Sequence, residues 1–168
     1  LGKELSEEEA QRMYDVKAHY FHEMPEAKIF DGVLDLMQKI KRSGLKIGIV
    51  TGSAQRPLIE RVTHDFADFI TRDQVTTAFD VKRGKPNPDP YLMGLKKAGN
   101  YSPSEGIVVE NAPLGVRAGV AAGCFTVAIN SGPLPDVALL DEGANILFPT
   151  IREFADRWED ILHEITHK

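Results

Sequence analysis

Short apolar runs that alternate with helical patterns constrain the fold of this chain more than any other feature. The runs at 46–51, 106–110 and 125–129 are apolar at most positions, which is typical of strands buried on both faces of a parallel sheet. Apolar residues at helical spacing follow each run. This order predicts an α/β protein with a doubly wound parallel sheet. We expect helices near 6–24, 32–42, 56–65, 88–98, 114–122, 135–142 and 151–165, and strands near 46–51, 76–79, 106–110, 125–129 and 145–148.

Composition and charge exclude several classes of protein. The chain has 168 residues, 42% of them hydrophobic, and a formal net charge of −5 with no block of Lys or Arg. Proteins that bind nucleic acids or membrane surfaces need a positive face, so neither partner is expected. The chain shows no apolar run of membrane length and no signal-peptide pattern, so we expect a cytoplasmic globular domain. The lone Cys124 is expected to be a buried packing residue.

Three polar segments end or follow apolar runs, where the loops of a parallel sheet meet a ligand. The first is Thr51-Gly52-Ser53. Gly52 would let the backbone approach an anion, and the two hydroxyls and successive N–H groups could hold a phosphate. Thr-Gly-Ser is a weak pattern, and taken alone it favours a strand-to-helix turn in which Ser53 caps the next helix. Gln55 and Arg56 are candidates for substrate contact by position only.

The second segment is rigid and carries one lysine. Lys85 lies between Gly84 and Pro86-Asn87-Pro88, where two prolines restrict the backbone and could aim one ammonium group into a cleft. A solvated surface lysine is the alternative. Asn87 is a further candidate for substrate contact, and Tyr91 is expected to pack.

The third segment ends a strand on an acid. Glu110-Asn111 closes the run at 106–110, and a carboxylate in this position is costly unless it meets a cation or hydrogen-bond donors. Mg²⁺ prefers one or two carboxylates, waters and substrate phosphate, so both residues are candidate Mg²⁺ ligands. The alternative is a capped strand end in which Asn111 opens the turn to the next helix. The five histidines show no spacing typical of a metal motif.

The order and spacing of these segments resemble motifs two, three and four of the haloacid dehalogenase superfamily. The most specific part is Gly-Lys-Pro-x-Pro-x-x-Tyr at 84–91, and the resemblance is closest to the β-phosphoglucomutase-like phosphatases. The resemblance is strong over residues 25–168 and weak over 1–24. It implies a core domain at 25–168 and, at 1–24, a remnant of an α-helical cap domain.

The resemblance also implies a chemistry and the residues that perform it. The implied enzyme is a Mg²⁺-dependent phosphohydrolase that acts through an aspartyl-phosphate, in which Thr51 hydrogen-bonds the transferred phosphoryl group. Lys85 would neutralise charge on the phosphoryl oxygens and on the nucleophilic carboxylate. The candidate catalytic residues are therefore Thr51 and Lys85, the candidate phosphate-binding residues Thr51, Gly52, Ser53, Gln55, Lys85 and Asn87, and the candidate metal ligands Glu110 and Asn111.

The first motif of that superfamily, Asp-x-Asp on the first strand, does not occur in this chain. The segment Asp31-Gly32-Val33-Leu34 resembles its flank, but the nucleophile position would be Ile29, which has no carboxylate. The resemblance therefore places the nucleophilic Asp, the acid/base Asp, their central strand and most of the cap upstream of Leu1. A sheet without that strand would expose two unpaired edges, so we expect association with the missing N-terminal segment or with a second copy.

The expected substrate is a small phosphorylated metabolite or pyrophosphate, since 75–81 together with Glu110-Asn111 looks like the pyrophosphatase-type members. A phosphosugar mutase and a non-catalytic truncated domain are alternatives, and a dehalogenase fits the lysine and acidic pattern less well. Most relatives carry Asp at the position of Asn111. Its neutral oxygen predicts weaker metal binding or an altered substrate preference. We expect the full-length parent to be an enzyme and the chain of 168 residues alone to be inactive.

Overall fold

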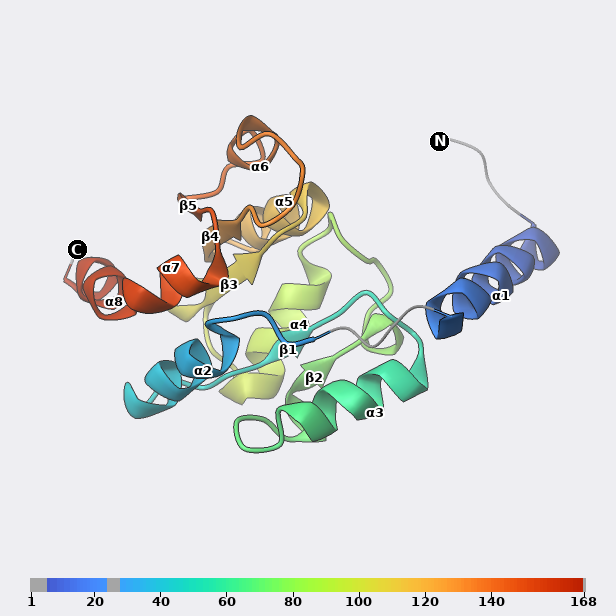
Figure 1. The fold of residues 1–168 in the computed structure, drawn as a ribbon, viewed down its shortest axis with the longest axis horizontal. Helices are drawn as coiled ribbons and strands as arrows, with labels where there is room; N and C mark the ends of the chain where they lie inside the picture. Colours follow the sequence, from blue (N-terminus) through green and yellow to red (C-terminus); the bar gives the residue numbers. More distant parts are fainter. Residues whose placement is uncertain (1–5, 24–27, 168) are drawn as a thin grey trace.

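The structure is a computed structural model that describes residues 6–23 and 28–167. Helices and strands alternate along it, and the course of the chain can be followed in Figure 1. The helices are α1 (Glu7–Glu23), α2 (Val33–Arg42), α3 (Arg56–Asp65), α4 (Asp89–Gly99), α5 (Pro113–Ala121), α6 (Val137–Leu140), α7 (Ile151–Asp156) and α8 (Trp158–Thr166). The strands are β1 (Ile49–Val50), β2 (Val75–Thr76), β3 (Ile107–Glu110), β4 (Phe125–Ile129) and β5 (Ile146–Phe148). Short 3₁₀ turns lie at Arg72–Gln74, Ala78–Asp80 and Pro103–Glu105.

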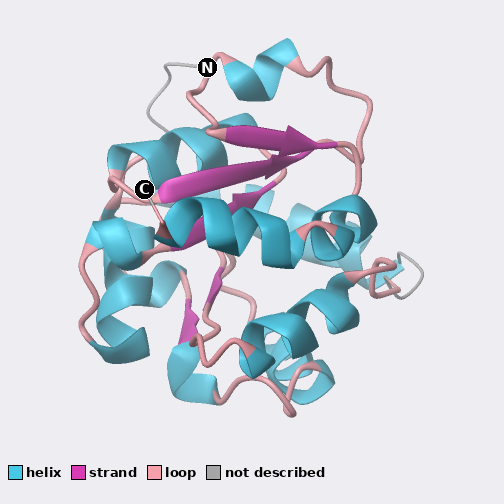
Figure 2. Cartoon of the chain, turned by 90° about the vertical axis from the view of Figure 1, so that its left-hand side faces the viewer, coloured by secondary structure: helices cyan, strands magenta, loops and turns pink. Residues whose placement is uncertain are grey.

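All pairing between these strands is parallel, and the strands form two sheets. β1 pairs with β2, while β3, β4 and β5 form the second sheet in that order. Figure 2 shows the pair of strands and the group of three as separate sets. Within residues 6–23 and 28–167, β1 has β2 as its sole partner strand and β3 has only β4. Each of these two strands therefore has one edge without a partner in the described part of the chain.

Helices cover both faces of the three-stranded sheet, as the doubly wound prediction requires. Val127 and Ile129 of β4 belong to a buried cluster with α7 and α8. Ala128, which points to the opposite face, packs instead with Val116 of α5 and Leu139 of α6. The predicted α/β fold with parallel strands buried on both faces is confirmed.

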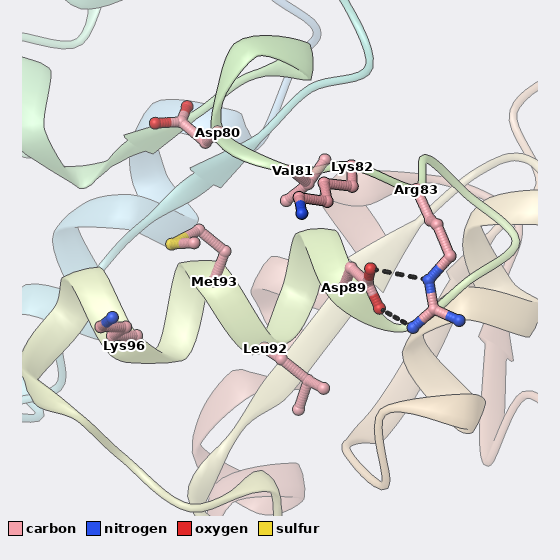
Figure 3. A pocket seen from close by; sticks show the side chains of 8 residues that line it. All are labelled: Asp80, Val81, Lys82, Arg83, Asp89, Leu92, Met93 and Lys96. Carbon is pink, nitrogen blue, oxygen red and sulfur yellow. Dashed lines mark hydrogen bonds and ion pairs between the residues drawn. The ribbon is translucent and has the colours of Figure 1, made fainter.

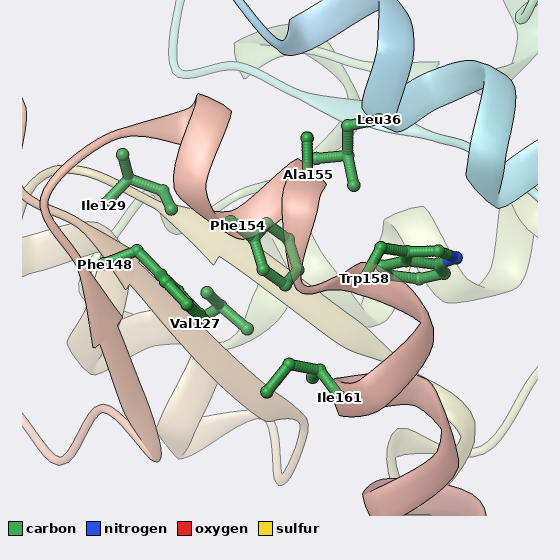
Figure 4. Packing of buried hydrophobic residues seen from close by; sticks show 8 residues of the cluster. All are labelled: Leu36, Val127, Ile129, Phe148, Phe154, Ala155, Trp158 and Ile161. Atoms are coloured by element: carbon green, nitrogen blue, oxygen red, sulfur yellow. The ribbon is translucent and has the colours of Figure 1, made fainter.

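The cluster between β4, α2 and the two C-terminal helices is built around aromatic rings (Figure 4). Phe154 lies 5.2 Å from Phe148 and 5.9 Å from Trp158 between ring centroids, the second pair edge to face. Trp158 is 2% exposed, and its indole N–H donates to Ser43 Oγ at 3.1 Å. This bond joins α8 to the end of α2. Trp158 is thus part of the core.

Several expected elements differ in extent from those of the structure, and two of them differ most. The single helix expected at 151–165 is wrong, because Arg157 (φ −101°, ψ 7°) separates α7 from α8 and donates its N–H to the carbonyls of both Glu153 and Phe154. The strand expected at 76–79 ends at Thr76. Thr77 then caps a 3₁₀ turn, since its hydroxyl accepts from the Phe79 N–H and its own N–H donates to Asp80 Oδ2 at 2.7 Å.

Helix α1 begins as the sequence predicts. Ser6 Oγ accepts from the N–H of Glu9 at 3.2 Å, and the Glu9 carboxylate accepts from the N–H of Ser6 at 3.0 Å, which is a capping box. α1 lies away from the two sheets in Figure 1. The helix end expected at Met24 and Pro25 falls outside the described residues.

Cys124 is 6% exposed, as predicted for a packing residue, and burial raises the pKa of its thiol.

The described segments include no helix with the length and hydropathy needed to cross a bilayer.

Candidate active site

The carboxyl ends of β1 and β3 meet at one lysine. Lys85 lies in the loop before α4, and its Nζ is 3.4 Å from the carbonyl oxygen of Val50, the last residue of β1. The same ammonium forms an ion pair with Glu110, the last residue of β3. Thr51 directly follows Val50. The structure thus gathers the three predicted segments at one place, although they lie far apart in the sequence.

The Glu110 carboxylate is held by four donors. The Lys85 ammonium and the Tyr91 hydroxyl, the latter at 2.7 Å, donate to Oε1. The N–H groups of Asn111 and Ala112 donate to Oε2 at 3.0 and 3.2 Å. An ionised carboxylate offers about four lone-pair sites, so all are in use. Burial would raise the pKa of Glu110, but these donors outweigh burial and lower it below its usual value. The group is therefore an ionised acceptor.

Tyr91 contacts both members of this ion pair. It packs with Val108 and Ala118 in a buried cluster, as predicted, but it also bonds Glu110, and its ring lies under the Lys85 ammonium at 5.0 Å from the centroid. Burial first, and the Glu110 charge second, raise the pKa of this phenol. This polar contact was not predicted from the sequence. The available signal was the place of Tyr91 in the first turn of α4, six residues after Lys85.

Two glycines let α5 approach the sheet closely. A Cβ on Gly119 would lie 2.8 Å from Thr126 Oγ1 and 2.9 Å from a methyl of Val108. A Cβ on Gly115 would overlap the Glu110 carboxylate itself. The start of α5 therefore forms one wall around the acid.

The Thr51-Gly52-Ser53 segment is organised by its own hydroxyls. Thr51 Oγ1 accepts from the Ser53 N–H at 3.1 Å, and Ser53 Oγ accepts from the Gln55 N–H at 3.1 Å. Ser53 is not the N-cap of α3, because that position belongs to Gln55. Both hydroxyls act as acceptors here and find no acceptor of their own among the residues described, so their protons are available to a ligand.

The remaining predicted residues differ in how they are placed. The Asn87 side chain donates to the carbonyl of Gly84 at 3.1 Å and so closes the loop that carries Lys85. Asn111 is exposed and Gln55 half-buried, and neither side-chain amide has a hydrogen bond within the described segments. Arg56 is exposed at the first position of α3.

The types of donor at the end of β3 suit Mg²⁺, although they do not complete a site. Glu110 offers a carboxylate and Asn111 an amide oxygen, which are ligands that Mg²⁺ accepts. The described ranges hold no group of three or more His, Cys, Asp or Glu arranged for a metal ion. Because its lone pairs are already used, Glu110 would have to release one of its four donors to bind a metal.

A hollow of about 620 Å³ lies along α4, apart from these residues (Figure 3). The loop at 80–83 and side chains of α4 line it, and Arg83 closes one end by a two-point ion pair with Asp89 at 2.8 and 3.0 Å. It contains none of the predicted site residues. We therefore take the ends of β1 and β3 as the candidate active site.

Comparison with known proteins agrees with this fold. Residues 1–129 match the family model described as haloacid dehalogenase-like hydrolase, so the chain belongs to the haloacid dehalogenase-like hydrolases. The predicted resemblance is confirmed.

Individual relatives are named as phosphatases or related enzymes. Hexitol phosphatase A of Escherichia coli is 41% identical over 100 residues, covering 60% of this chain and 45% of that protein. Validoxylamine A 7'-phosphate phosphatase of Streptomyces hygroscopicus subsp. limoneus is 34% identical over 139 residues, covering 83% and 62%. A solved candidate beta-phosphoglucomutase of Bacteroides vulgatus is 47% identical with a TM-score of 0.90, covering 99% of this chain and 67% of that one. The chain thus spans 45% and 62% of the two curated relatives.

Proposed function

We propose that the full-length protein is a phosphohydrolase that removes phosphate from a small phosphorylated metabolite through an aspartyl-phosphate. The observation that carries this proposal is the Lys85–Glu110 ion pair at the ends of β1 and β3. The Lys85 ammonium also contacts the carbonyl of Val50, the residue directly before Thr51. The similarity to two phosphatases of phosphorylated polyols and related compounds supports it.

Lys85 has the position and the hydrogens that phosphoryl transfer requires. An ammonium group has three N–H donors, of which Glu110 and the Val50 carbonyl take two. The third is left for a phosphoryl oxygen, where fixed positive charge stabilises the transition state. The hydroxyl protons of Thr51 and Ser53 would hold further phosphoryl oxygens. In this scheme Glu110 keeps the ammonium fixed, and the backbone of Gly52, which is exposed, leaves room for the anion.

The proposed nucleophile is an Asp on a strand outside these 168 residues. β1 and β3 each have one edge without a partner in the described part of the chain, and a strand pairing with both would end beside Lys85. The division into a core at 25–168 and a cap remnant at 1–24 is part of the same proposal. Met13, Val16 and Tyr20 on α1 are 61%, 51% and 63% exposed, as expected for a helix that packs against further cap residues.

Mg²⁺ is the proposed cofactor, with Glu110 and Asn111 among its ligands. The ion would supply additional positive charge to the phosphoryl group. Asn111 contributes a neutral oxygen, so we expect weaker metal binding than a second carboxylate would give.

A phosphosugar mutase is the second candidate, since the 47% identity to the Bacteroides vulgatus protein favours it. A hydrolase releases inorganic phosphate, whereas a mutase returns an isomerised sugar phosphate. The segment at 75–81 resembles the pyrophosphatase-type members, so pyrophosphate is a further candidate substrate.

The test is phosphate release by the full-length protein, with and without Mg²⁺, from sugar phosphates, polyol phosphates and pyrophosphate. We expect Mg²⁺-dependent release, and a loss of about 100-fold or more in Lys85→Met, the size typical of removing one charge-stabilising donor. Lys82→Met is the matched control, because Lys82 is exposed and outside the site. Absence of release across the panel contradicts the proposal. The chain of 168 residues alone should release none.

A further inference from the structure

We propose that Tyr91 is a positioning residue that fixes Lys85 and Glu110 for phosphoryl transfer, a role that rests on the proposed function. Nothing in the similarity to the relatives assigns a task to this side chain.

Tyr91 is placed to restrain both charged groups at once. Its hydroxyl donates at 2.7 Å to Oε1 of Glu110, the same oxygen that accepts from the Lys85 ammonium. Its ring lies 5.0 Å from the Lys85 ammonium, within the range in which an aromatic face attracts a cation. The Tyr91 side chain thus contacts both members of the ion pair, Glu110 through its hydroxyl and Lys85 through its ring.

The rest of the surroundings makes this restraint effective. Tyr91 is 7% exposed and packs with Val108, Ala118 and Ala122, so its ring has little freedom to move. The N–H groups of Asn111 and Ala112 hold Oε2. The hydroxyl of Tyr91 fixes the other carboxylate oxygen, and rotation of Glu110 would break bonds at both ends.

A purely structural role makes a different prediction. If Tyr91 only fills the core, phenylalanine has the same ring and should serve equally well. If Tyr91 positions the ion pair, removing the hydroxyl leaves Oε1 with Lys85 as its one remaining donor among the described residues, and the Lys85–Glu110 pair can shift while the packing stays intact. Tyr91→Phe therefore separates the two roles.

The kinetic test compares Tyr91→Phe, Lys85→Met and the double variant in the full-length protein. We expect Tyr91→Phe to lower kcat about 10- to 100-fold, as loss of an outer hydrogen-bond partner does at comparable sites, with KM changed less than kcat. In the Lys85→Met background the same substitution should have a smaller effect, because one of the two groups that it positions is gone. Tyr101→Phe is the control, since Tyr101 is 40% exposed and outside the site. Equal losses in both backgrounds, or wild-type kcat in Tyr91→Phe, overturn the proposal.

Crystal structures of the full-length wild type and of Tyr91→Phe give a readout that does not depend on activity. We expect the Lys85–Glu110 contact in the wild type and a displaced ammonium in the variant. An unchanged contact in Tyr91→Phe overturns the positioning role, whatever the kinetics. If the wild type releases no phosphate, the proposed function fails, and the two crystal structures still decide whether Tyr91 holds the pair.

Discussion

The carboxylate of Glu110 occupies the space in which a side chain at residue 115 would begin. Gly115 lies in the first turn of α5, and a Cβ there would overlap the Cδ and both oxygens of Glu110. The helix can therefore start beside the acid only because residue 115 has no side chain. The consequence is that a residue without any functional group controls the geometry of the candidate active site.

Gly115→Ala should displace the Glu110 carboxylate and weaken its contact with Lys85. We expect phosphate release to fall about 10- to 100-fold, as it does when an outer partner of a site is disturbed. Overpacking should also lower the free energy of unfolding by about 1–3 kcal/mol. Urea denaturation and phosphate release in the full-length protein measure the two effects. Gly132→Ala is the control, because a Cβ at Gly132 meets nothing within 4 Å. Equal behaviour of the two variants would contradict the steric argument.

Asp80 should make the protein more stable above pH 4 than below it. Burial would raise the pKa of Asp80, but hydrogen bonds from Lys97 and from Thr77 outweigh burial and lower the pKa to about 2. Because the pKa is lower in the folded state than the value of about 3.9 in the unfolded chain, the stabilisation is present above pH 4. It is lost as the pH falls from about 4 toward 2, and the loss at pH 3 is about 1 kcal/mol.

The measurement is urea denaturation of wild type and Asp80→Asn at pH 6 and pH 3. The variant should be less stable at pH 6 and should lose less stability on acidification, by about 1 kcal/mol. Asp141→Asn is the matched control, since Asp141 is exposed and away from Lys97. An identical acid dependence of the wild type and Asp80→Asn would rule this role out.

Thr76→Val should stabilise the protein. Thr76 is 0% exposed, and its hydroxyl oxygen has no hydrogen-bond partner within the residues described. An unsatisfied buried hydroxyl costs about 1–3 kcal/mol, and valine has nearly the same shape. We expect the free energy of unfolding to rise by about 1 kcal/mol.

Thr126→Val is the matched comparison for that change. Thr126 is equally buried at 0%, but its hydroxyl donates to the Cys124 carbonyl at 3.1 Å. This variant should be destabilised by about 1 kcal/mol. Urea midpoints that move in the same direction for both threonines would show that the hydrogen bond is not what distinguishes them.

Cys124 should be unreactive in the folded protein. It is 6% exposed, and burial raises the pKa of its thiol, so both access and the thiolate fraction are reduced. Peptide mapping after brief alkylation at pH 7.5 should find Cys124 unmodified without urea and fully modified in urea. Rapid modification without urea would show that the helix-to-strand turn at 122–125 opens readily.

The extent of a strand was predicted best where the strand has a partner strand on each edge. The expected strand at 125–129 agrees with β4 at both ends, and β4 has partner strands on both edges. The strand expected at 46–51 is reduced to Ile49–Val50, because β1 has a ladder on one edge only within the described segments. Apolar runs identify candidate strands, but the length of a strand depends on its neighbours.

The candidate site was predicted in part. The order of the polar segments, read through the family resemblance, brought Thr51, Lys85 and Glu110 to one edge of the fold. The Tyr91 donor to Glu110 could not be predicted from the sequence, since it depends on how α4 packs against β3. The unsatisfied hydroxyl of Thr76 likewise arises from packing between segments that no local pattern relates.

Trp158 makes the docking of the C-terminal helices optically visible. It is the only tryptophan of these 168 residues and lies, 2% exposed, in a buried cluster with Phe154, Leu36 and Ile161. An indole in such surroundings emits at shorter wavelength than one in water. Its emission therefore reports whether α8 is seated on α2, and a red shift would register the loosening of this joint before the whole molecule unfolds.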